Sequence, residues 1–120
     1  MHTILVIEDQ KLLRLMLCDE LKKNDFHTLE AEDGIEGMDK VENEDISLII
    51  TDLIMPNLEG VDFLNLLSNC YPDIKVIAWT SLLKEHPTYQ EAAEIIGEDK
   101  IITKTDSMDG LVANVKSLLG

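Results

Sequence analysis

Short apolar runs and amphipathic helical segments alternate five times along this 120-residue chain. The runs are mostly apolar and rich in branched residues, which is typical of strands that are buried on both faces. Such an alternation predicts an α/β fold in which helices cover both faces of a parallel sheet. We expect the five strands at residues 3–7, 26–31, 46–51, 74–79 and 100–103.

The helical segments place apolar residues three and four positions apart, so each is expected to bury one stripe against the sheet. The stripes expected on the first two helices are Leu13, Met16, Leu17 and Leu21, then Ile35, Met38 and Val41. Cys18 and Cys70 lie within such patterns and have no zinc-ligand spacing. We therefore expect two buried free thiols rather than a disulfide.

Composition and charge narrow the class of protein. The length and the apolar content suit one globular domain over residues 1–120. The formal net charge of −14 repels phosphate backbones, which argues against direct nucleic-acid binding. No apolar run is long enough to span a bilayer, and the first residues lack the pattern of a signal peptide. We expect a cytoplasmic domain that does not act at a membrane.

Ionisable and hydroxyl residues follow four of the expected strands. Glu8 and Asp9 follow the first strand, Asp52 the third, Thr80 the fourth and Lys104 the fifth. Ligands of open α/β sheets bind beyond the carboxyl ends of the strands, so these side chains are expected to converge. Each of them alone would have an ordinary explanation as a helix cap, a turn residue or a surface charge. Their joint placement predicts a functional site.

Three neighbouring carboxylates need a counter-charge. Two unit charges about 4 Å apart repel by about 4 kcal/mol at an effective dielectric constant of about 20. Several such repulsion energies would exceed what a domain of ordinary stability can lose and remain folded. A small all-oxygen site with room for water suits Mg²⁺ better than zinc, and it suits phosphate chemistry. Lys104 and the Thr80 hydroxyl are suited to contact phosphoryl oxygens.

This ordered set resembles the receiver domain of bacterial response regulators. The resemblance is carried by Glu8-Asp9, by the segment DLIMPNLEG at residues 52–60, by Thr80-Ser81 and by Lys104, and it covers the whole chain. It implies a flavodoxin-like three-layer sandwich with a five-stranded parallel sheet in the order 2-1-3-4-5 and five helices. It also implies a two-component phosphorelay, in which a phosphoryl group switches a protein-interaction surface.

The resemblance assigns a role to each residue of the set. Asp52 would be the phosphoacceptor, Thr80 the switch hydroxyl and Lys104 the partner of the phosphoryl group. The domain would catalyse only its own phosphorylation and dephosphorylation, and would otherwise not be an enzyme. The implied ligands of Mg²⁺ are Asp9 directly, Asp52, Glu8 mainly through water, and the backbone carbonyl of Ile54.

Three features of the last third of the chain depart from the family pattern. Thr105 follows Lys104 where proline, commonly with a cis bond, is usual. A cis bond before threonine would cost about 3 kcal/mol, which favours a trans bond. Ile101 replaces the expected switch aromatic, so any relay would be aliphatic. The loop at residues 80–87 is slightly longer than usual, which alters the output face.

Two apolar residues lie where a polar side chain would orient an attacking water. They are Ile54, two residues after Asp52, and Leu82, two residues after Thr80. We therefore predict slow loss of the phosphoryl group. Trp79 is expected to pack in the core and to report on the site by fluorescence.

The implied phosphodonor is a sensor histidine kinase or a phosphotransfer protein. The signal would pass to a downstream protein or to a C-terminal output domain, since the chain is either a free-standing receiver or the head of a longer regulator. A homodimer through the last two helices and the fifth strand is compatible with the sequence, although no single residue supports it.

The rival function is a constitutive interaction module that signals without phosphate. The missing proline and aromatic favour this rival, and the complete charged set argues against it. A Mg²⁺-dependent phosphatase would need a general acid where Ile54 stands. A flavodoxin would need a phosphate loop in place of Glu8-Asp9.

Overall fold

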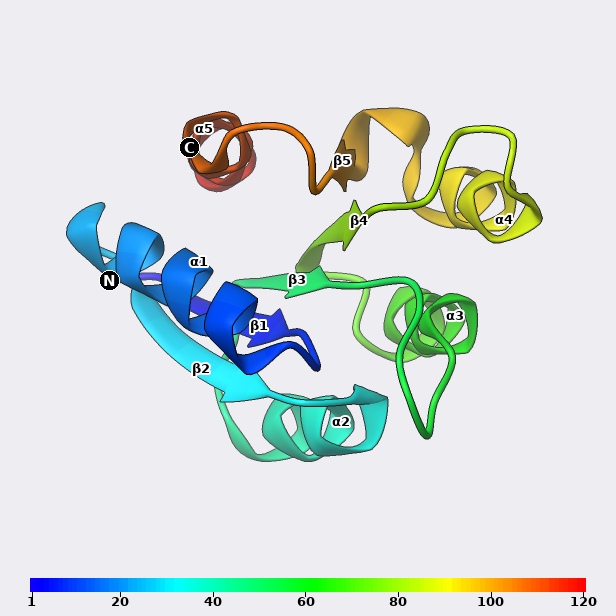
Figure 1. Cartoon of the computed structure of the whole chain (residues 1–120). Coiled ribbons are helices and arrows are strands. Elements are labelled where there is room, and N and C mark those ends of the chain that lie inside the picture. The colour runs from blue at the N-terminus through cyan, green and yellow to red at the C-terminus, as the bar shows by residue number, and fades with distance from the viewer.

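The computed structural model describes residues 1–120 and contains one five-stranded parallel sheet in the order β2-β1-β3-β4-β5 (Figure 1). The strands pair in continuous parallel register, with β1 between β2 and β3. This arrangement confirms the expected fold class and strand order. The strands are β1 (Thr3–Ile7), β2 (His27–Ala31), β3 (Leu48–Thr51), β4 (Lys75–Thr80) and β5 (Ile101–Thr103).

Five α-helices form the two outer layers of the sandwich (Figure 1). Helices α1 and α5 share one core with residues of β1, β3 and β4, whereas α2, α3 and α4 pack on the opposite face of the sheet. A short 3₁₀ helix, η1 (Glu98–Lys100), connects α4 to β5. The helices are α1 (Lys11–Lys23), α2 (Gly34–Asn43), α3 (Gly60–Cys70), α4 (Pro87–Ile96) and α5 (Met108–Leu119).

The strand bounds differ from the expected ones by one or two residues. Strand β3 begins at Leu48, and Phe26 precedes β2. Strand β4 ends one residue later than expected, so Thr80 is its last residue, and Lys100 belongs to η1 rather than to β5. These shifts leave the same polar residues at the carboxyl ends of the strands.

The buried face of α1 differs from the expected apolar stripe. Met16 was expected in the core, but it is 50% exposed. Arg14 is buried instead, together with Leu17, Cys18 and Leu21. Apolar spacing alone could not predict this face, because a charged residue takes a core position only where polar partners lie beneath the helix.

Helix α2 approaches the sheet through small residues. Ile35 was expected to be buried, but it is 61% exposed. The buried positions are Gly34, Gly37 and Val41. A Cβ atom on Gly37 would lie 2.5 Å from Cδ1 of Ile7, so a larger residue here would require the end of the Ile7 side chain to move. The side chain of Ile35 therefore lies outside the contact that Gly34 and Gly37 make with the rest of the fold.

The two cysteines are both free, as expected, but only one is buried. Cys18 lies in the core beneath α1, and burial raises the pKa of its thiol to about 11. Cys70 is exposed at the end of α3, so the prediction that it is buried was wrong.

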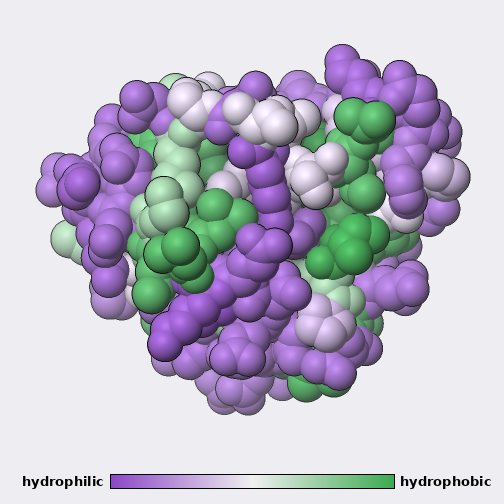
Figure 2. Space-filling model, viewed as in Figure 1, coloured by the Kyte–Doolittle hydropathy of each residue, from purple (hydrophilic) through white to green (hydrophobic).

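The surface is mainly hydrophilic (Figure 2). On the face shown, hydrophobic residues form separate patches, and hydrophilic residues run between them. None of the helices combines the length and the apolar character that crossing a membrane requires.

Candidate functional site

The polar residues singled out from the sequence lie at the carboxyl edge of the sheet. Glu8 and Asp9 follow β1, and Asp52 follows β3, the strand next to β1. Lys104 follows β5, and Thr80 is the last residue of β4, which pairs with β5. Because parallel strands all point toward this edge, residues far apart in the sequence are brought together here.

Three carboxylates and one ammonium group form the centre of the site. One carboxylate oxygen from each of Glu8, Asp9 and Asp52 lies within 4.8 Å of the others. Nζ of Lys104 donates to Oδ2 of Asp52 at 2.8 Å and to Oε1 of Glu8. Glu8 and Asp52 are buried, whereas Asp9 is exposed, so the cluster opens to solvent on one side.

The charges of this cluster do not balance. Burial raises the pKa of Glu8, and the neighbouring Asp9 adds to that rise, although the hydrogen bond from Lys104 opposes it. Burial disfavours the charged form of Lys104, but its hydrogen bonds with Asp52 and Glu8 raise its pKa nonetheless. One ammonium group thus faces three carboxylates, and this excess of negative charge is of the kind that a bound cation relieves.

The carboxylate of Asp52 is oriented from two sides. Its Oδ1 atom accepts hydrogen bonds from the backbone N–H groups of Leu53, at 2.7 Å, and Ile54, at 3.4 Å. Its Oδ2 atom accepts from Lys104. The backbone of Ile54 therefore lies beside Asp52, while its side chain is 56% exposed. These hydrogen bonds fix the orientation of the Asp52 carboxylate at the edge of the cluster.

The loop that follows Asp52 is held by two close contacts. The N–H of Gly60 donates to the carbonyl of Leu53, and a Cβ atom on Gly60 would lie 2.5 Å from Cα of Leu53. Asn57 has a positive φ of 73° and donates from its side chain to Oδ2 of Asp33 at 2.6 Å. Asp33 also caps the N-terminus of α2. The segment 52–60 is thus anchored to both α2 and α3.

Thr80 is buried next to the backbone of Lys104. Its hydroxyl accepts the N–H of Leu82 at 3.1 Å, and its carbonyl accepts the N–H of Lys104 at 2.8 Å. A hydroxyl that accepts a hydrogen bond still has its own hydrogen to donate. The chain has no cis peptide bond, so the bond between Lys104 and Thr105 is trans. Ile101 is buried in the core that contains α3 and α4, which includes the aromatic ring of Tyr89 beside aliphatic side chains.

Arg14 belongs to the surroundings of the site, and sequence reasoning did not identify it. Its Nη1 atom donates to the backbone carbonyl of Glu8 at 2.6 Å, and its Nε atom donates to Oε1 of Glu30 at 2.9 Å. The N–H of Glu8 donates to the carbonyl of Ala31 at 3.1 Å. The backbone of Glu8 is therefore held on both sides. An arginine on the apolar face of the helix, six residues after Glu8, was the available signal.

Trp79 packs in the core, as expected, and also contacts the site. It is 3% exposed and lies in the core shared by α1 and α5. Nζ of Lys104 lies 5.4 Å from the centroid of its ring. The indole is thus a third partner of the ammonium group, beside Glu8 and Asp52.

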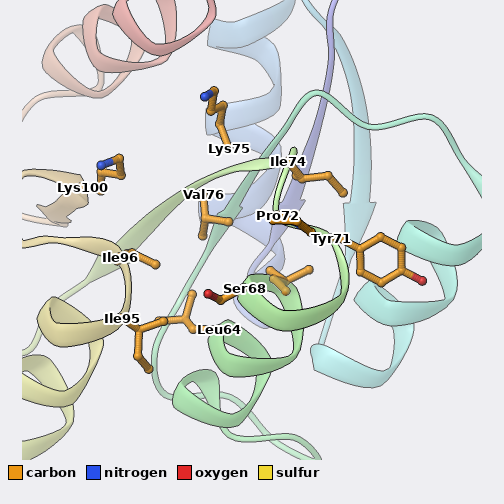
Figure 3. Close-up of a pocket in the computed structure, with 11 residues that line it drawn as sticks. Leu64, Ser68, Tyr71, Pro72, Ile74, Lys75, Val76, Ile95, Ile96 and Lys100 are labelled. Atoms are coloured by element: carbon orange, nitrogen blue, oxygen red, sulfur yellow. The ribbon is translucent and has the colours of Figure 1, made fainter.

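A separate cavity of about 250 Å³ lies between α3, α4 and the amino end of β4 (Figure 3). Leu64, Val76 and Ile96 contribute to its mainly apolar lining, and Lys75 and Lys100 lie at its edge. None of its lining residues carries a carboxylate. The cavity therefore has no part in the acidic cluster, which lies at the opposite end of the strands.

Residues 4–116 match a family model described as the response regulator receiver domain. The response regulator receiver protein CpdR of Brucella abortus is 24% identical over 119 residues, which cover 99% of this chain and 98% of that protein. The phosphate regulon transcriptional regulatory protein PhoB of Klebsiella pneumoniae is 32% identical over 118 residues, which cover 97% of this chain and 51% of that protein. The chain thus spans nearly all of one relative and about half the length of the other.

Solved structures give the same result. The response regulator TrrA of Thermotoga maritima, in complex with Mg²⁺-BeF, superposes with a TM-score of 0.85 and 27% identity over 98% of this chain and 99% of that one. A DNA-binding response regulator of the LuxR family from Staphylococcus aureus superposes with a TM-score of 0.89 and 26% identity over 100% of both chains. The family match, the strand order and the acidic cluster agree, and this chain belongs to the response regulator receiver domains of two-component signalling systems.

Proposed function

We propose that the chain accepts a phosphoryl group on Asp52 from a histidine kinase or a phosphotransfer protein, in a Mg²⁺-dependent reaction. One observation carries this proposal. The carboxylates of Glu8, Asp9 and Asp52 lie within 4.8 Å of one another, and Lys104 pairs with two of them. Phosphoryl transfer requires a positioned nucleophile and positive charge around the phosphoryl oxygens. Asp52 would be the nucleophile, and Lys104 together with a cation held by the carboxylates would supply the positive charge.

The donor atoms fit Mg²⁺. They are all oxygens, and the exposed position of Asp9 leaves room for the water ligands that this ion retains. The proposed ligands are Asp9 directly, Asp52, Glu8 mainly through water, and the backbone carbonyl of Ile54. Once bound, the ion would supply positive charge for the phosphoryl oxygens. The relative TrrA, solved in complex with Mg²⁺-BeF, supports the assignment.

In the proposed reaction, a carboxylate oxygen of Asp52 attacks the phosphorus atom in line. The bond between phosphorus and the donor nitrogen breaks, and the nitrogen keeps the electron pair and takes up a proton. The product is an acyl phosphate, which carries more negative charge and more acceptor oxygens than the carboxylate did. Lys104, which already contacts Oδ2 of Asp52, would then pair with a phosphoryl oxygen.

The same group would switch the surface of the domain. The Thr80 hydroxyl keeps a hydrogen that it would donate to a phosphoryl oxygen. Because Lys104 and Thr80 are joined by a backbone hydrogen bond, a shift of either residue would move the ends of β4 and β5 together. Ile101 would pass the shift on by aliphatic repacking. We propose a downstream protein or an output domain as the recipient of this signal, in the cytoplasm and without nucleic-acid contacts by this chain.

Intact-mass measurement after treatment with acetyl phosphate and Mg²⁺ tests the proposal. The wild type should gain one phosphoryl group, whereas Asp52→Asn and Asp9→Ala should not. An adduct on the Asp52→Asn variant would refute the assigned nucleophile. A folded wild type that gains no adduct would favour the rival, a phosphorylation-independent interaction module, which the trans bond before Thr105 and the aliphatic Ile101 make the second candidate.

A further inference from the structure

We infer that Trp79 is a positioning residue for Lys104, and that the face of its indole ring holds the ammonium group at the site of phosphoryl transfer. The inference rests on the function proposed above. Nζ of Lys104 lies 5.4 Å from the ring centroid. This distance falls within the roughly 6 Å over which a cation is attracted to the negative face of an aromatic ring, and tryptophan is the strongest such partner.

Trp79 is built as a rigid platform. It is the last residue but one of β4, and strand pairing places it opposite Ile102, two residues before Lys104. Its side chain is 3% exposed and is packed against the core beneath α1 and α5. A ring that is immobilised in this way offers the lysine one fixed contact surface.

The indole differs from the other two partners of Lys104 in one respect. Glu8 and Asp52 are also the proposed ligands of Mg²⁺, so the lysine and the metal compete for their charge. Mg²⁺ prefers oxygen ligands, and the indole ring has none to offer. The contact between Trp79 and Lys104 therefore does not depend on how the carboxylates divide their charge. It keeps the ammonium group close to Asp52 when the metal is bound.

Fluorinated tryptophan gives a test that leaves the shape of the core nearly unchanged. Trp79 is the only tryptophan of the chain, so tryptophan with one, two or three ring fluorines can replace it cleanly. Fluorine withdraws charge from the face of the ring and weakens its attraction for a cation. At saturating Mg²⁺, the rate of phosphorylation by acetyl phosphate should fall step by step, by about three- to tenfold in total. A purely structural role for Trp79 would leave the rate unchanged.

Proton NMR gives a second test that needs no phosphodonor. Methylene protons above an indole ring are shifted upfield, so the ε-methylene protons of Lys104 should show this shift in the wild type, with and without Mg²⁺. The shift should persist in part in Trp79→Phe and vanish in Trp79→Leu. Val112→Ala is the matched control, because Val112 lies in the same core and is not one of the side-chain partners of Lys104, which are Glu8, Asp52 and Trp79. It should lose stability and keep the shift.

The outcomes separate this inference from the proposed function. If the unlabelled protein and all of the fluorinated proteins are phosphorylated at the same rate, the role of Trp79 is overturned and Asp52 remains the proposed phosphoacceptor. A wild type that is never phosphorylated would overturn both. An absent methylene shift in the wild type with Mg²⁺ bound would overturn the inference whatever the phosphorylation assay gives.

Discussion

Nζ of Lys104 lies 2.8 Å from Oδ2 of Asp52, and the same ammonium group contacts Glu8. One lysine thus neutralises part of the charge of two buried carboxylates, while the third carboxylate, Asp9, faces solvent. A divalent cation that binds this cluster must share both buried carboxylates with the lysine. Lys104 and the metal are therefore competitors at the start of the proposed reaction and partners once a phosphoryl group is present.

Replacement of Lys104 separates these two roles. Lys104→Met should bind Mg²⁺ about tenfold more tightly, because it removes a positive charge a few Å from the metal ligands. The same variant should be phosphorylated at least about tenfold more slowly, because the phosphoryl oxygens lose their partner. Titration calorimetry measures the affinity, and intact mass follows the adduct. Lys100→Met, a half-buried lysine of η1 outside the cluster, should change neither.

The metal-free cluster predicts a specific dependence of stability on pH. Burial raises the pKa of Glu8 above its usual value of 4.5, so the fold binds this proton more tightly than the unfolded chain does. The resulting stabilisation is complete below about pH 4.5 and is lost as the pH rises through the raised pKa. Glu8→Gln retains the uncharged form, and in EDTA at pH 7 it should unfold at higher urea than the wild type.

The control for this prediction is the pH at which the variant and the wild type become equally stable. The difference in the free energy of unfolding between Glu8→Gln and the wild type should shrink toward pH 4.5. With excess Mg²⁺ at pH 7, the wild type should gain more stability than the variant, since it has one more carboxylate near the metal. A difference that stays constant between pH 4.5 and 7 would contradict the assigned cause.

The parallel sheet and the acidic cluster were predictable from the alternating pattern of the sequence, whereas the strand order was implied by the resemblance to receiver domains. The carboxyl ends of parallel strands meet at one edge, so residues that directly follow the strands must come together there. Glu8, Asp52 and Lys104 come into contact for this reason, although 96 positions separate the first from the last. An error of one or two residues in the predicted position of a strand end does not change which polar residues meet at this edge.

The contacts around the cluster were not predictable in the same way. Arg14 and Met16 both fit a helical stripe, and only the carbonyl of Glu8 and the carboxylate of Glu30 beneath α1 decide that the arginine is buried. The contact of Trp79 with Lys104 depends on the register between β4 and β5, which no sequence pattern specifies. Ile35 was misplaced because the buried face of α2 consists of Gly34, Gly37 and Val41.

Removal of Arg14 should destabilise the fold. Arg14→Met would leave the carboxylate of Glu30 and the carbonyl of Glu8 without this donor, and the expected cost is about 3 kcal/mol in the free energy of unfolding. Lys22→Met, an exposed basic residue of the same helix, should cost less than about 0.5 kcal/mol. Urea denaturation of both variants measures the difference, and equal costs would refute the structural role of Arg14.

The two cysteines should differ in their reactivity toward a disulfide reagent at pH 8. Cys70 is exposed and should react rapidly. Cys18 is buried, and its pKa of about 11 instead of 9.0 lowers its thiolate fraction, so it should react at least about a hundredfold more slowly. Cys70→Ser should retain only the slow thiol. Rapid reaction of two thiols in the native protein would contradict the burial of Cys18.

We predict that two apolar side chains prolong the lifetime of the phosphoryl group proposed on Asp52. Ile54 is 56% exposed beside Asp52, and Leu82 is half-buried where its N–H contacts Thr80. Neither side chain can orient or activate a water molecule for attack on the acyl phosphate. Ile54→Asn or Leu82→Glu would supply a hydrogen-bonding group at these positions, and each should shorten the half-life of the adduct about tenfold.

Intact mass, followed over time after removal of the phosphodonor, measures this half-life. Leu83→Glu is the matched control, because it adds the same carboxylate one position further along an exposed loop. It should leave the half-life unchanged, which would separate an oriented carboxylate from a general change in charge. If both Ile54→Asn and Leu82→Glu keep the wild-type half-life, the lack of a water-orienting side chain at these positions is not what limits hydrolysis. The intrinsic stability of the acyl phosphate, held by Lys104, would then set the rate.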